Sequence, residues 1–229
     1  MNPTRINTAM IPLLIRKDWY LHRYEILGAV AVGLIALPIS VFTGKAGFIL
    51  GVILLVGALV TISMQMAITT VINERKEQTL AFVMSLPVSP REYTTAKILA
   101  NLLIFLLAWA VILLGALALI LLAPGIPHGI LPFAVIMIAE LLVTGCLIFS
   151  VAIMTESQPW TIAALLVGEF AFNLVGYAVA HTHGIAAYME GAHVYWNAAS
   201  VAILGAELAL VALLLGLTFF VQGRKTDFL

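Results

Sequence analysis

Charged residues and cysteines are scarce in this sequence. Only 10% of the 229 residues are Asp, Glu, Lys or Arg, whereas soluble domains carry about 25%. The formal net charge is zero, so the overall charge does not favour a nucleic acid as partner. A single cysteine, Cys146, excludes an intrachain disulfide and any metal site built from paired cysteines. Hydrophobic residues make up 63% of the chain, which indicates an integral membrane protein.

Charges are rare over long parts of the chain. A membrane-spanning helix needs about 20 consecutive apolar residues. Lipid cannot satisfy the open edge of a strand, and the apolar runs lack the alternation of barrel strands. We therefore predict an all-α integral membrane protein with a single transmembrane domain over residues 1–229. Its six predicted spans cover about 25–43, 46–72, 98–123, 131–154, 160–180 and 198–222.

Lysines and arginines are unevenly distributed. Ten of the eleven precede the first span, separate the second from the third or follow the sixth, and only Lys45 lies elsewhere. With six spans these three segments fall on one side of the membrane. The positive-inside rule makes that side the cytoplasm, which predicts that both termini are cytoplasmic. Residues 3–24 mix apolar, aromatic and basic side chains, which favours an interfacial amphipathic helix over an ordinary charged tail.

Residues 73–97, between the second and third spans, hold seven charged side chains. Ser89, Pro90 and Glu92 form the pattern of a capped helix N-terminus, so the third helix should begin near Pro90. A helix from there to Ala123 would be about 51 Å long, whereas the hydrocarbon core is about 30 Å thick. This helix should therefore extend out of the membrane, and a short helix should precede it. A solvated loop without a partner is the alternative.

The stretch ERKEQTLAFVMSLPVSPREYTTAKILA resembles the segment that follows the second span in the membrane subunits of type-2 ABC exporters. The shared features are Glu-Arg, Thr-Leu, Leu-Pro-Val-Ser and a lysine that enters span three. The leader LLIRKDWYLHR is similar to the interfacial connecting helix of that family. Lys76 and Glu77 stand where the family usually has glycine.

The resemblance implies a permease subunit of an ATP-driven exporter in the bacterial cell (inner) membrane. Two copies would pair within the membrane lipid, and two separate ATPase subunits would bind ATP and Mg²⁺, with no cofactor and no catalysis on this chain. The sequence agrees, since it contains no G-x-x-x-x-G-K-[ST] phosphate loop. Residues 73–97 would form the coupling helix, and spans two and five would face the translocation path. The residues implied to couple to the ATPase are Glu74, Arg75, Thr79, Leu80, Leu86, Pro87, Ser89 and Arg91.

Polar stripes run along the two spans that the resemblance places at the pathway. Residues four apart share one face of a helix. Because lipid offers no hydrogen bonds, such stripes indicate either a translocation pathway or helix–helix hydrogen bonding. If they line a pathway, they suit an amphipathic or cationic substrate. The candidate pathway residues are Thr61, Gln65 and Thr69 in span two and Glu169, Asn173 and Tyr177 in span five.

Two further carboxylates, Glu140 and Glu207, lie near the middle of their predicted spans. An ionisable group there costs about 2.5–3.5 kcal/mol, which makes each a candidate functional residue. A protonated carboxyl bonded to a neighbouring helix is the structural alternative. Together with Glu169 they leave open a proton-coupled secondary transporter, and a membrane anchor that binds a partner is also open. An intramembrane enzyme is disfavoured because no Ser/His or Asp/Asp pair occurs at a plausible depth.

The outer loop between spans five and six contains His181, His183 and His193. These histidines have one nearby carboxylate, Glu190, and outer loops often carry histidines. We therefore predict no metal site.

Overall fold

The computed structural model describes residues 10–73 and 90–224, and within these ranges every regular element is a helix. The long helices are α1 (Met10–Phe42), α2 (Gly44–Ala67), α5 (Pro90–Leu122), α6 (Leu131–Thr155), α7 (Gln158–His181) and α9 (Ala198–Arg224). The short elements are the π-helix η1 (Ile68–Asn73), the 3-10 helix η2 (His128–Ile130) and the four-residue helix α8 (His183–Ala186).

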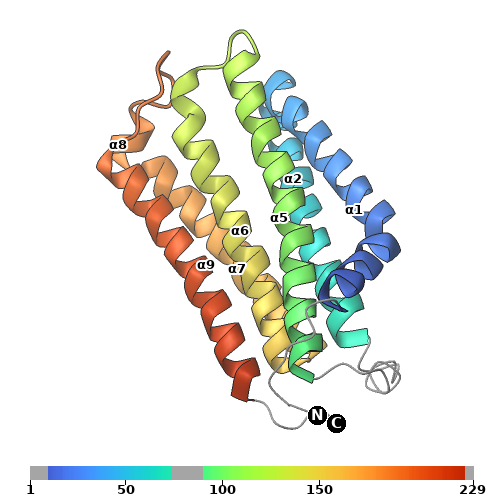
Figure 1. Ribbon diagram of the computed structural model, residues 1–229. Helices are drawn as coiled ribbons and strands as arrows, with labels where there is room; N and C mark the ends of the chain where they lie inside the picture. The colour runs from blue at the N-terminus through green and yellow to red at the C-terminus, as the bar shows by residue number, and fades with distance from the viewer. Residues whose placement is uncertain (1–9, 74–89, 225–229) are drawn as a thin grey trace.

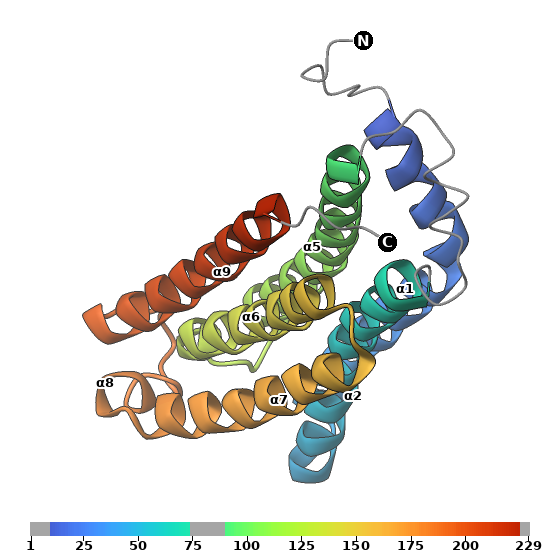
Figure 2. The ribbon, with the colours of Figure 1, turned by 90° about the horizontal axis from the view of Figure 1, so that it is seen from below.

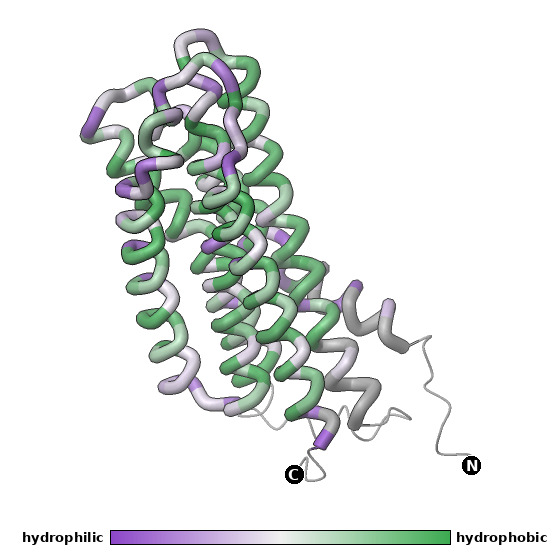
Figure 3. Tube along the Cα trace, turned by 90° about the vertical axis from the view of Figure 1, so that its left-hand side faces the viewer, coloured by the Kyte–Doolittle hydropathy of each residue, from purple (hydrophilic) through white to green (hydrophobic). Residues whose placement is uncertain are grey.

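Six of these helices are long and apolar enough to cross a membrane, which confirms the predicted number of spans. The candidate spans are Trp19–Phe42, Gly44–Asn73, Ile98–Leu122, His128–Thr155, Gln158–His181 and Ala198–Gln222. Figure 3 shows hydrophobic residues along the helices and hydrophilic residues mainly toward the ends of the bundle. That distribution is the one expected of helices whose sides face lipid.

Helix α6 forms the centre of the bundle. In its most apolar stretch 83% of the residues are buried, against 11% for α9. Helices α7 and α9 pack on opposite sides of α6, and α2 and α5 also contact it, while α1 covers α2 and α5 (Figures 1 and 2). Within the described residues, α6 is the one helix that α9 contacts extensively, and its contact with α8 is small.

Aromatic and aliphatic side chains fill the space around α6. Phe105 of α5 is fully buried and meets Phe149 of α6 edge to face, with ring centroids 5.4 Å apart. Gly145 lies directly against the Phe105 ring, and a Cβ atom there would overlap it. Small residues therefore let α5 and α6 approach closely, as in other membrane helix pairs.

The first helix differs from the boundary predicted at residue 25. Helix α1 is continuous from Met10 and includes much of the segment predicted to lie in the interface. Its first turns extend away from the other helices before it joins the bundle (Figure 2). The structure does not separate an interfacial helix from the first span, so the interfacial placement stays a prediction.

Helix α5 begins at Pro90, the predicted first residue, and its 33 residues give a length of about 50 Å. The candidate span within it begins only at Ile98. The first two turns of α5 thus lie outside the apolar stretch, as predicted. The rest of the predicted coupling helix, residues 74–89, lies outside the described residues.

Candidate functional site

The residues predicted to couple to an ATPase are not tested by the structure. Seven of them fall in residues 74–89, outside the described part of the chain, and the side chain of Arg91 is not described either. The described ends that flank this segment are Asn73 of η1 and Pro90 of α5, and both lie at the lower end of the bundle in Figure 1.

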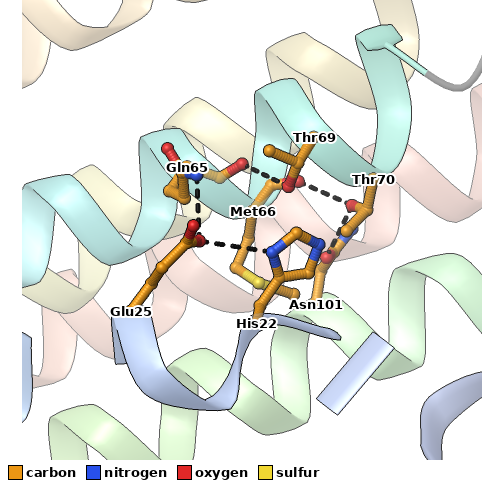
Figure 4. A network of polar contacts seen from close by, with 7 residues as sticks. All are labelled: His22, Glu25, Gln65, Met66, Thr69, Thr70 and Asn101. Carbon is orange, nitrogen blue, oxygen red and sulfur yellow. Dashed lines mark hydrogen bonds and ion pairs between the residues drawn. The ribbon is translucent and has the colours of Figure 1, made fainter. Parts of the chain in front are cut away.

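The polar stripe of α2 contributes to a network with α1 and η1 (Figure 4). The Gln65 side chain donates from Nε2 to Oε2 of Glu25 at 2.9 Å. The Thr69 hydroxyl donates to the backbone carbonyl of Gln65 at 2.7 Å, so it is satisfied within its own helix. Thr61, one turn before Gln65, is exposed. Of the three predicted residues, Thr61 is thus available to a ligand or a partner helix, whereas Gln65 already contacts Glu25 of α1.

Glu25 joins this stripe, although the sequence analysis did not select it. Its carboxylate lies 3.3 Å from Nδ1 of His22 and remains largely exposed, with 56% of the side chain accessible. The His22 side chain is by contrast only 10% accessible. The i, i+3 spacing of His22 and Glu25 at the start of an apolar run was the available signal. This spacing did not stand out because the surrounding leader is rich in other charged and aromatic residues.

A groove of about 250 Å³ lies between α1 and α2 at this network. Its polar lining is a carboxylate, an amide and a hydroxyl, from Glu25, Gln65 and Thr61. Its apolar lining comes from Ile26, Ala29, Ile62 and Met66. A groove lined by a carboxylate and by apolar side chains is suited to a ligand that joins a cationic group to a hydrocarbon part.

Deeper in the same network, Thr70 of η1 connects α2 with α5. Its hydroxyl lies 2.6 Å from the Met66 carbonyl and 2.9 Å from Oδ1 of Asn101 (Figure 4). Both Thr70 and Asn101 are buried. This contact fixes the end of α2, which leads into residues 74–89, to the helix that follows them.

The stripe of α7 is more open and largely bonds within its own helix. Asn173 donates to the Glu169 carbonyl at 2.8 Å, and the Tyr177 ring stacks on His181 with centroids 4.1 Å apart. Asn173 and Tyr177 are exposed, whereas Glu169 is half-buried. The stripe therefore presents a carboxylate, an amide and a phenol on the surface of the single chain.

The two predicted stripes do not form one cluster. Helices α2 and α7 contact each other, but among the described residues no hydrogen bond joins the stripes. The α2 stripe lies near the end of α2 that leads into η1, whereas the α7 stripe runs from the middle of α7 toward α8. In a single chain the candidate pathway thus consists of two separate polar surfaces.

Glu140 and Glu207, the other two predicted carboxylates, are brought together by the fold. They lie on α6 and α9, both are buried, and their carboxylates interact electrostatically. No basic residue accompanies them, since residues 98–223 contain neither lysine nor arginine.

The outer histidines are spread over the end of α7, α8 and the following loop. In the described ranges no three His, Cys, Asp or Glu side chains lie close enough together to hold a metal ion.

Comparison with known proteins gives one finding. The model of the ABC-2 family transporter proteins matches residues 13–222, which is nearly the whole chain. No curated protein and no solved structure matches. The matched range includes α2, α5, α6 and α7 in full, nearly all of α1 and α9, the α1–α2 groove and the polar stripes. The chain therefore belongs to the ABC-2 family of transporter membrane proteins.

Proposed function

We propose that this chain is the permease subunit of an ATP-driven exporter, in which two copies enclose the translocation path and each couples to a separate ATPase subunit. The observation that carries the proposal is the family match over residues 13–222. In this family the membrane subunit is a non-catalytic transport component, and ATP is bound by an ATPase partner. A bacterial inner membrane, with both termini in the cytoplasm, is the location that fits this role and the distribution of positive charge.

Residues 74–89 are proposed as the main ATPase contact. They connect η1 to α5 at one end of the bundle, and a simple reversal between helices needs only about 2 to 8 residues. This connection has 16 residues, counting from 74 to 89. The extra length and the charges provide surface for a partner. The π-helical turns of η1 adjoin it, and such turns are frequent at functional sites.

The substrate path is proposed to run along α2 and α7, between two copies. This proposal is supported by the exposure of Thr61, Asn173 and Tyr177 in the single chain. Within the described residues, no other helix of the same chain covers these polar side chains. The carboxylates of Glu25 and Glu169 would favour a cationic amphipathic substrate over an anionic one. In reconstituted vesicles, Glu25→Gln and Glu169→Gln should therefore reduce transport of cationic substrates, and an unchanged substrate preference would remove both from the path.

Co-purification tests the ATPase contact directly. The protein is isolated gently from its native membrane, once unaltered and once with Glu74→Lys, Arg75→Glu and Leu86→Asp. We expect an ATPase subunit to accompany the unaltered protein and to be lost from the variant, because reversed charges and a buried acid oppose docking. The matched control is Lys45→Glu, which reverses the one cation predicted on the other side. Purification without any ATPase would contradict the proposal.

A proton-coupled secondary transporter is the second candidate, and the buried Glu140–Glu207 pair is the observation that favours it. The two functions differ in their energy source. Collapse of the proton gradient at constant ATP should leave transport by the exporter intact and should abolish proton-coupled transport.

A further inference from the structure

Glu140 and Glu207 lie on two packed helices, α6 and α9, at a place that the proposed translocation path does not use. Their exposed fractions are 5% and 6%, and their carboxylates interact electrostatically between α6 and α9. Figure 2 shows α7 and α9 on opposite sides of α6. Glu207, on α9, is therefore separated from the polar stripe of α7 by the central helix of the bundle.

Hydrogen-bond donors are missing from this place. Both carboxylate oxygens of Glu207 are buried without a partner in the described part of the chain. A buried carboxylate without a donor is costly, because it loses the hydrogen bonds that water would give. The geometry thus leaves acceptor positions open for a ligand that carries a proton or a positive charge.

No protein cation supplies that charge. Lysine and arginine are absent from residues 98–223, which cover α6, α7, α8 and all of α9 except its last residue, the exposed Arg224. Among the described residues of α6, α7 and α8, the other titratable side chains are the buried thiol of Cys146, half-buried Glu169 and exposed Tyr177, His181 and His183. Two negative carboxylates side by side within a membrane repel each other and gain nothing from lipid.

We propose that Glu140 and Glu207 form a proton-binding site at neutral pH, in which the protonated carboxyl of one residue donates a hydrogen bond to a carboxyl oxygen of the other. The bound proton joins α9 to α6. This link matters for α9 because α6 is the one helix that α9 contacts extensively among the described residues. Polar contacts between α6 and α9 include the hydroxyl of Ser150 on the Leu214 carbonyl and the amide of Gln222 on the Ile153 carbonyl.

Dicyclohexylcarbodiimide tests the site, because this apolar reagent enters membranes and reacts with protonated carboxyl groups. The full-length protein is treated in its native membrane at a series of pH values, and the modified residues are identified by peptide mass spectrometry. We expect modification of Glu140 or Glu207 at neutral pH. As the site loses its proton at higher pH, the labelling rate should fall by about tenfold per pH unit. Absence of a label on both residues at neutral pH would overturn the proposal.

Variants and added salt show whether the site at Glu140 and Glu207 binds a proton or a metal cation. Glu169→Gln, which alters the carboxylate on α7, should leave the labelling of Glu140 and Glu207 unchanged. The double variant Glu140→Gln and Glu207→Gln should not be labelled. At alkaline pH the native site loses its proton, whereas the two amides of the variant stay neutral. The backbone amides of α9 should then exchange with deuterium more slowly in the variant than in the unaltered protein. If sodium chloride at constant pH protects the carboxyl groups from labelling, the site binds a metal cation in place of the proton, which would overturn the proposal. Equal deuterium exchange of the α9 amides in the variant and the unaltered protein would also overturn it.

Discussion

Thr69 and Thr70 are adjacent residues of one π-helix, but their side chains have different roles. The Thr69 hydroxyl bonds to the Gln65 carbonyl one turn earlier in α2, whereas the Thr70 hydroxyl contacts both the Met66 carbonyl of α2 and Asn101 of α5. We expect Thr70→Val to lower the free energy of unfolding by about 1–2 kcal/mol, because the buried Asn101 amide loses its partner. Thermal unfolding in detergent measures the change.

The matched control for this variant is Thr69→Val. It removes a hydroxyl from the same turn without isolating a buried group, so its effect should stay within about 0.5 kcal/mol. Thr70→Ser, which keeps the hydroxyl, should recover most of the loss. Equal destabilisation by Thr69→Val and Thr70→Val would show that the contact with Asn101 contributes nothing to stability.

Residue spacing in the sequence identified part of the site but could not decide what each polar group does. The i, i+4 pattern selected Gln65 and Asn173 alike. In the fold, the Gln65 side chain bonds across to α1, whereas the Asn173 side chain bonds back to its own helix. Glu25 was not selected because its partner lies 40 residues away, and that pairing depends on how α1 packs against α2. The Glu140–Glu207 contact depends on tertiary structure in the same way.

Among the helical elements, α1 and α2 pack most closely through the glycines of α2. A Cβ atom on Gly51 would lie 2.6 Å from the Ser40 backbone nitrogen and 2.7 Å from the Ala36 carbonyl oxygen. These are backbone atoms, which cannot move away as a flexible side chain can. We therefore expect Gly51→Ala to lower the free energy of unfolding by about 1–3 kcal/mol, the usual cost of overpacking. Unfolding of the purified protein, followed by heat or denaturant, measures this.

Gly57 provides a control in the same helix. Nothing lies within 4 Å of a Cβ atom at this position, so Gly57→Ala adds no clash. Alanine has a higher helix propensity than glycine by up to about 1 kcal/mol. Gly57→Ala should therefore leave the stability unchanged or raise it. A stabilising Gly51→Ala would show that the two helices do not pack in this way.

The elements themselves were predictable because hydrophobicity and length determine a membrane span. Boundaries at sharp sequence signals were predicted well, as at Pro90. The start of α1 was less clear, because composition changes near residue 24 without any proline or glycine between Pro12 and Gly28 to end a helix. Pro38 lies inside α1 without ending it. Proline is tolerated in membrane helices because neighbouring helices and side chains can satisfy the backbone groups that it frees.

In the whole molecule, exposed surfaces differ in what they can contact. The apolar runs of α6 and α9 look alike in the sequence, yet α6 is central and α9 peripheral. Hydrophobicity cannot distinguish these positions, because lipid and protein interior are equally apolar. The proposed pairing of two copies adds a third environment, the interface between the copies. In that arrangement α7 would face the partner copy and α9 would face lipid.

Cysteine cross-linking distinguishes these two surfaces, and the single native cysteine simplifies the experiment. In a Cys146→Ala background, one variant carries Tyr177→Cys on α7 and the other carries Leu213→Cys on α9, both at exposed positions. With a short thiol-specific linker in native membranes, we expect Tyr177→Cys to give a covalent dimer and Leu213→Cys to remain monomeric. The physical reason is that α7, with its polar stripe, needs a partner to cover it, whereas the apolar surface of α9 is satisfied by lipid. Dimers formed only through Leu213→Cys would place the interface on α9, and the stripe of α7 could not then line a path between two copies.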